Sequence, residues 1–140
     1  MHVTCLVLPV PAAQRDRYHD WAAHSARLLA DLGCVEQVTC WEDRVPDGER
    51  TDFRRAVAAE AGEKIVVVWQ LWPDRETLAA AEAAMATDPR FDVPDDLPFD
   101  PRRAILGTFA PLHATRADLA PEPPARDVSP PEAPARDAAS

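Results

Sequence analysis

The 140-residue sequence has very little positive charge available for a polyanionic partner, because Lys64 is its single lysine. Acidic residues number 24 against 15 lysines and arginines, and the formal net charge is −9 at pH 7. A protein that binds nucleic acid needs a basic surface that neutralises phosphates. The composition therefore excludes nucleic acid as an expected partner.

A long hydrophobic segment is also missing, since the longest uninterrupted apolar run covers only residues 65–69. A transmembrane helix needs about 20 such residues. The first residues lead directly into a strand-like pattern, without the basic region and apolar stretch of a secretory signal. We therefore expect a soluble protein of the cytoplasm that has no membrane partner.

Cysteine is scarce, and the three residues present, Cys5, Cys34 and Cys40, form no C-x-x-C pair. An odd number of separated thiols favours a reducing compartment over a disulfide framework. The nucleotide-binding G-x-G-x-x-G and P-loop motifs, the zinc-protease motif H-E-x-x-H and the EF-hand loop are all absent from the sequence. No cofactor and no metal ion are expected.

Among the patterns that are present, two indicate buried central strands. Residues 3–10 (VTCLVLPV) and 63–72 (EKIVVVWQLW) place apolar side chains on both alternating faces. Residues 34–43 (CVEQVTCWED) mix polar and apolar side chains with a period of two, which is typical of an edge strand. A fourth strand is expected at residues 103–112 (RAILGTFAPL).

Between these strands the apolar spacing becomes helical. Residues 12–32 repeat apolar side chains every three or four positions until Gly33. A short helix is expected over residues 51–61 with Thr51 as its cap, and a second long helix begins at Asp74. This order predicts an α+β fold, a ferredoxin-like split βαβ arrangement with a four-stranded antiparallel sheet. The first and third strands lie in its middle, and both long helices cover one face.

The strand at residues 63–72 is apolar on both faces, so its two sides must be assigned. One side carries Ile65, Val67, Trp69 and Leu71, and the other carries Val66, Val68 and Trp72. We assign the second set to the face that the helices leave bare. Because exposed apolar patches of this size are uncommon on monomers, we predict that a second copy of the chain covers that face.

The C-terminal part has a different composition from the rest. Residues 114–140 contain six of the 15 prolines: Pro121, Pro123, Pro124, Pro130, Pro131 and Pro134. They include no aromatic residue and carry the near-repeat PPARD and APARD. Such a segment buries too little apolar area to offset its ordering entropy. We expect one α+β domain over residues 1–113 and a disordered, acidic, Pro/Ala-rich tail over residues 114–140.

Several ordered blocks resemble the YbaA-like family of uncharacterised bacterial proteins. They are Cys40-Trp41, Val45 to Gly48, Thr51 to Phe53, Ala56-Val57, Trp69, Met85, Asp88 to Arg90, Pro98 to Asp100, Arg103, Gly107 and Phe109. The chain departs from the family pattern at Thr4-Cys5, at Thr39 and at Thr108. The resemblance places the domain in the dimeric α+β barrel superfamily and implies a homodimer.

The resemblance also sets the expected functions by analogy. The wider superfamily includes cofactor-independent monooxygenases, isomerases and lactone-forming enzymes, chlorite dismutase-like haem proteins and non-catalytic members. The first hypothesis is therefore a small-molecule-binding protein, with the possibility of a cofactor-independent monooxygenase, isomerase or cyclase activity on an aromatic or polyketide-like metabolite. The alternative is a non-catalytic dimeric binding or accessory protein.

Four aromatic residues are the candidates for the walls of a ligand pocket: Tyr18, Trp41, Trp69 and Phe109. The pocket would lie between sheet and helices or inside the dimer barrel, and a planar aromatic ligand would suit it. Large aromatic side chains also dominate ordinary cores and interfaces. The alternative for all four is therefore a purely structural role.

Two polar residues are the candidates for catalysis. His19 lies beside Tyr18 and Asp20 and would transfer a proton if it faces the pocket, although a solvated surface histidine is the alternative. Arg103 would present its guanidinium to a carboxylate or enolate. Its alternative is a structural ion pair with a nearby acid such as Asp100, Asp52 or Asp43.

Overall fold

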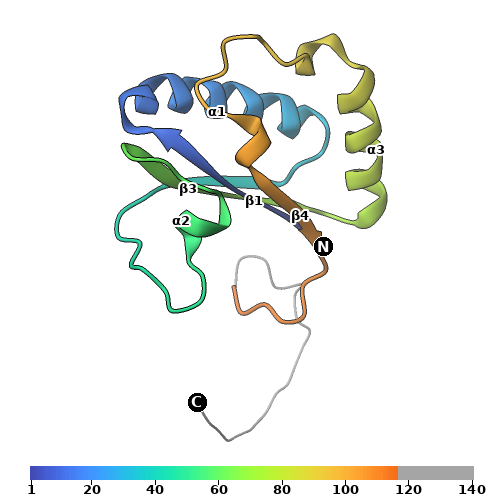
Figure 1. Cartoon of the computed structure of the whole chain (residues 1–140). Coiled ribbons are helices and arrows are strands. Elements are labelled where there is room, and N and C mark those ends of the chain that lie inside the picture. The colour runs from blue at the N-terminus through green and yellow to red at the C-terminus, as the bar shows by residue number, and fades with distance from the viewer. Residues whose placement is uncertain (117–140) are drawn as a thin grey trace, which may run out of the picture.

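The computed structural model describes residues 1–116, which form one four-stranded antiparallel sheet and two long helices (Figure 1). The strands are β1 (His2–Pro11), β2 (Glu36–Trp41), β3 (Glu63–Trp72) and β4 (Ile105–Phe109). The helices are α1 (Arg15–Asp31), the single-turn α2 (Phe53–Ala56) and α3 (Arg75–Thr87), with 3-10 turns η1 (Ala12–Gln14), η2 (Pro89–Phe91) and η3 (Pro101–Arg103). The predicted α+β class is confirmed. Most of the predicted tail lies outside the described residues.

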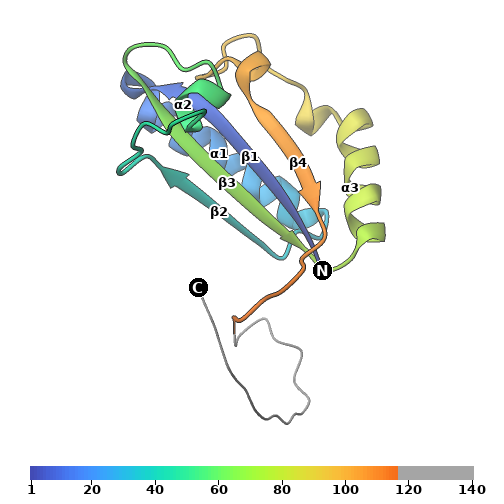
Figure 2. The same cartoon turned by 60° about the horizontal axis from the view of Figure 1, so that its bottom comes forward.

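The strand order is β2-β3-β1-β4, so the two apolar strands β1 and β3 are central. They pair antiparallel along their whole length, from His2 opposite Trp72 to Pro11 opposite Glu63. The helices α1 and α3 lie on one side of the sheet, whereas α2 lies on the other (Figures 1 and 2). The predicted order of strands and the placement of both long helices on one face are therefore confirmed.

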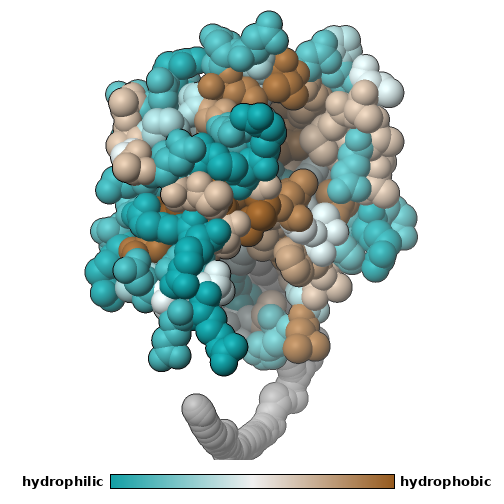
Figure 3. Space-filling view, viewed as in Figure 1, coloured by the Kyte–Doolittle hydropathy of each residue, from teal (hydrophilic) through white to brown (hydrophobic). Residues whose placement is uncertain are grey.

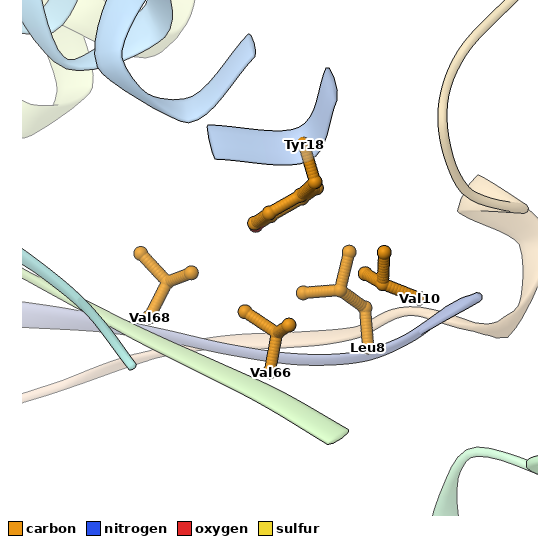
Figure 4. Close-up of a cluster of buried hydrophobic side chains, with 5 residues drawn as sticks. All are labelled: Leu8, Val10, Tyr18, Val66 and Val68. Carbon is orange, nitrogen blue, oxygen red and sulfur yellow. The ribbon is translucent and has the colours of Figure 1, made fainter. Parts of the chain in front are cut away.

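The assignment of the two faces of β3 was wrong. Val66 and Val68 are buried beneath α1, where they contact Tyr18. Figure 4 shows both valines and Leu8 pointing from the sheet toward the Tyr18 ring. Trp72 is also fully buried on the helix side, in a second cluster with Leu29, Leu78 and Ala81. Both faces of β3 are mostly apolar in sequence, so alternation alone does not say which one the helices cover.

The face without long helices carries the opposite set of side chains, because residues that are paired across neighbouring strands point to the same side. We call it the open face. From the strand register it carries Val3, Cys5 and Val7 of β1, Val38 and Cys40 of β2, Ile65, Val67, Trp69 and Leu71 of β3, and Ile105, Gly107 and Phe109 of β4. Ile65 and Leu71 are buried, whereas others on this face are not. Trp69 is 38% exposed and Phe109 is 55% exposed. An apolar sheet face therefore remains open to solvent in the single chain.

The element boundaries follow local chemistry. The helix α1 ends before Gly33, which has a positive φ of 105° and therefore suits glycine. Asp74 caps α3 by accepting a hydrogen bond from the Thr77 amide at 2.7 Å, as predicted. The cap of α2 is Asp52 rather than Thr51, since its carboxylate accepts from the Arg55 amide. Arg103 belongs to η3 and not to the fourth strand, which begins at Ile105.

Candidate functional site

A cavity of about 320 Å³ lies between α1 and the edge strand β2, on the helix side of the sheet. We call it the α1–β2 cavity. Its lining residues are Arg15, Tyr18, His19, Ala22, Ala23 and Ala26 from α1, Gln37, Thr39 and Trp41 from β2, and Val66 from β3. Three of the six side chains predicted for the site are in this lining: Tyr18, His19 and Trp41.

The sequence creates this space through small side chains on one helix face. Ala22 and Ala26 follow Tyr18 at intervals of four residues, so the three stack along the same side of α1. Opposite them, Gln37, Thr39 and Trp41 alternate on the helix side of β2. Alanine methyl groups do not span the distance to an edge strand, and a cavity remains between the two elements.

Tyr18 forms the inner wall of the cavity. Its side chain is buried against Leu8, Val66 and Val68, and its ring meets Phe99 edge to face with 5.7 Å between centroids. Burial raises the pKa of the Tyr18 phenol to about 12. The hydroxyl group is therefore protonated at physiological pH and is able to donate a hydrogen bond.

Trp41 and Arg15 form the outer wall. The guanidinium carbon of Arg15 lies 5.7 Å from the centroid of the Trp41 ring, a cation–π distance. This contact holds a positive charge against an aromatic face at the edge of the cavity. The α1–β2 cavity thus combines a flat aromatic surface with a cation.

His19 lies in the lining but is mostly solvent-exposed. Its Nδ1 atom is 3.3 Å from Oδ1 of Asp20, and the His19 side chain is 76% exposed. A ligand in the cavity would meet His19 at the rim rather than at the inner wall.

Trp69 and Phe109 lie away from the α1–β2 cavity, on the open face of the sheet. The Phe109 ring covers Gly107, where a Cβ atom would come within 2.9 Å of it. The four predicted aromatic wall residues are thus divided between the two faces of the sheet. Tyr18 and Trp41 are together, and Trp69 and Phe109 share the other side.

Arg103 is engaged by protein carboxylates. Its Nη1 and Nη2 atoms each donate to one carboxylate oxygen of Glu63 at 2.6 Å, and its Nε donates to Asp100 at 3.3 Å. Nη1 also donates to the Ala58 carbonyl at 3.0 Å. The Arg103 guanidinium holds the pKa of the Glu63 carboxyl below its usual value. This network supports the structural alternative for Arg103, including its predicted pairing with Asp100.

A second cleft, of about 720 Å³, has Arg103 in its wall. It lies along residues 93–103 and also includes Glu60 and Glu63. His19 is absent from its lining, so the two candidate catalytic residues belong to different depressions.

Within residues 1–116, no three His, Cys, Asp or Glu side chains come together as a metal site. The same part of the chain contains no helix long and apolar enough to cross a membrane.

Comparison with known proteins confirms the family resemblance of the ordered sequence blocks. Residues 1–101 match the family described as "Protein of unknown function (DUF1428)". The uncharacterized protein YbaA of Escherichia coli strain K12 is 41% identical over 109 residues, which cover 77% of this chain and 93% of YbaA. The YbaA proteins of Escherichia coli O157:H7 and Shigella flexneri match to the same extent. The chain therefore belongs to the DUF1428 family.

Proposed function

We propose that this protein binds a small planar apolar or aromatic metabolite in the α1–β2 cavity. The observation that carries the proposal is a cavity of about 320 Å³ with an aromatic ring in each wall, Tyr18 on the inside and Trp41 on the outside. Ligand pockets in proteins begin at roughly 300 Å³ and are mostly apolar with a few polar groups. A ligand of one or two fused rings fits this space.

Any chemical conversion would take place in the same cavity and without a cofactor. His19 is the candidate for proton transfer, because it lines the cavity and histidine is the side chain that enzymes use most often as a general acid or base. The Tyr18 hydroxyl would donate a hydrogen bond to a developing negative charge. Arg103 has no part in this arrangement, since its guanidinium is held by Glu63 and Asp100.

We further propose that a second copy of the chain covers the open face. Figure 3 looks at the β4 edge of the sheet, where hydrophobic residues lie near the centre of the view between hydrophilic ones. Ile105 is 46% exposed and Phe109 is 55% exposed on this strand. Apolar side chains that continue across all four strands of a sheet favour association with an equally apolar surface. This homodimer leaves the α1–β2 cavity on the outer, helix side of each protomer.

The proposed binding site predicts a difference between two tryptophan variants. Calorimetric titration with cinnamamide, a neutral planar aromatic probe, is expected to show about tenfold weaker binding to the Trp41→Leu variant than to the wild type. The Trp69→Leu variant is the matched control, because Trp69 lies on the open face. Its affinity for the probe should equal that of the wild type.

The opposite pattern of affinities in the two variants would place the binding site on the other face of the sheet. If Trp69→Leu loses affinity and Trp41→Leu keeps it, the ligand binds on the open face, inside the barrel that two copies form. If neither cinnamamide nor its carboxylate analogue cinnamate binds to any of the three proteins, the α1–β2 cavity is not a site for planar aromatic ligands. The non-catalytic accessory function would then be the better account of the protein.

A further inference from the structure

The α1–β2 cavity differs in charge from the rest of the protein. The whole chain has 24 acidic residues and a formal net charge of −9. Yet none of the lining residues in the described chain is an aspartate or a glutamate, and two of them, Arg15 and His19, are basic. Their neighbouring carboxylates, Asp16 and Asp20, lie outside the lining and are strongly exposed. The electrostatic potential inside a concave site is set mainly by the charged side chains that line it. The α1–β2 cavity therefore favours an anion, although the protein as a whole is acidic.

The Arg15 guanidinium is available to such an anion. The carboxylate paired with it among residues 1–116 is that of Asp16, at 3.6 Å, and the two side chains are 62% and 98% exposed. Ion pairs between exposed side chains contribute little and exchange readily with another carboxylate. The Arg15 guanidinium also lies 5.7 Å from the centroid of the Trp41 ring, at the edge of the cavity. Arg15 differs in this respect from Arg103, whose guanidinium forms an ion pair with the buried carboxylate of Glu63.

Two neutral polar side chains of the lining, Tyr18 and Gln37, carry hydrogen-bond donor groups. The Oε1 atom of Gln37 accepts a hydrogen bond from Nε2 of Gln70 at 2.9 Å. This fixes the Gln37 amide so that its NH₂ group is left to donate. Tyr18 adds a hydroxyl group that stays protonated at physiological pH. A ligand that accepts hydrogen bonds and carries negative charge complements this set.

We propose that the ligand of the α1–β2 cavity is an aromatic carboxylate, with its ring against Trp41 and its carboxylate on the guanidinium of Arg15. This inference rests on the proposed function and adds the charge of the ligand to it. Arginine binds a carboxylate through two parallel N–H···O bonds, which a neutral amide cannot accept in the same way. Arg15 is then a specificity-determining residue for the anionic group.

The test compares two probes of the same shape on three proteins. By calorimetric titration at pH 7, wild-type protein is expected to bind cinnamate about tenfold more tightly than cinnamamide. The Arg15→Gln variant should lose that tenfold preference and keep its affinity for cinnamamide. The matched control is Arg27→Gln, which removes the same charge from an exposed position of α1 outside the cavity lining. It should retain the wild-type preference.

The outcomes separate the charge of the ligand from the existence of the site. Equal binding of cinnamate and cinnamamide to the wild type would overturn the anionic ligand and leave the aromatic site in place. Loss of preference in both arginine variants would also overturn it, because the effect would then come from net charge alone. Binding of neither probe would contradict the anionic ligand and the proposed function together. An Arg15→Lys variant that keeps part of the preference would support a direct charge contact.

Discussion

The Val66→Asp variant is expected not to fold. Val66 is fully buried between the sheet and Tyr18, so the new carboxylate would lie in the core without a partner. An unpaired charge in the interior costs several kcal/mol, and the lost burial of the valine adds about 1.5–3 kcal/mol. Together these exceed about 5 kcal/mol, which is the lower end of the stability of a small domain. Circular dichroism and near-ultraviolet spectra of the purified variant provide the measurement.

The Val38→Asp variant is the control on the opposite face. Val38 is 39% exposed on the edge strand β2, and an aspartate there stays in contact with water. This variant should fold, and light scattering should report a monomer where the wild type forms the proposed dimer. A folded Val66→Asp protein would contradict the assignment of the two sheet faces. A dimeric Val38→Asp protein would place the interface elsewhere.

The Glu63→Gln variant is expected to lose about 2–3 kcal/mol of unfolding free energy at pH 7. The Glu63 and Arg103 side chains are only 7% and 19% exposed. Within residues 1–116, the substitution leaves Asp100 as the ion-pair partner of the Arg103 guanidinium. The expected loss of unfolding free energy is smaller than the usual cost of breaking a fully buried ion pair, because Arg103 retains some contact with water. Urea unfolding of both proteins is the measurement.

The same pair makes stability depend on pH. The folded-state pKa of Glu63 is lowered from its ordinary value of 4.5, chiefly by the hydrogen bonds from Arg103. The native state therefore binds a proton less readily than the unfolded state. The stabilisation is complete above about pH 5 and is lost as the pH falls through the folded-state pKa. The difference between the wild type and Glu63→Gln should shrink correspondingly in acid.

The control for this prediction is Glu60→Gln, which removes a carboxylate from an exposed position of the same loop. Its unfolding free energy should stay within about 0.5 kcal/mol of the wild type. If Glu63→Gln is equally mild, the ion pair with Arg103 contributes nothing measurable. A catalytic or ligand-binding role for Arg103 would then regain support.

The regular elements could be predicted from the sequence because their patterns are local. The alternation in residues 63–72 and the helical spacing that ends at Gly33 each correspond to an element of the structure. The buried face of β3 could not be predicted in this way, because both of its faces are mostly apolar. Which face is buried depends on the side of the sheet against which α1 and α3 pack. The packing of the helices against the sheet depends on contacts between residues far apart in the chain, such as Trp72 with Leu29.

The sequence also identifies only some of the residues that line the α1–β2 cavity, because the rest depend on which strands and helices lie side by side. Aromatic residues mark possible walls, and Tyr18 and Trp41 are indeed brought together, but their spacing does not separate them from Trp69 and Phe109. Arg15 was missed, although its position one turn before His19 on a helix is a usable signal. Arg103 is the first residue of the expected fourth strand and is a candidate on that ground. Its partner Glu63 lies 40 positions away in sequence, so the ion pair was not predictable from local order.

The central claim is that the α1–β2 cavity binds a planar aromatic ligand, and backbone amide chemical shifts during a cinnamate titration test it most directly. The largest shifts are predicted on the helix segment around Tyr18, Ala22 and Ala26, and on β2 from Gln37 to Trp41. Shifts confined to the open face, to the cleft along residues 93–103, or to no residues at all would contradict the claim.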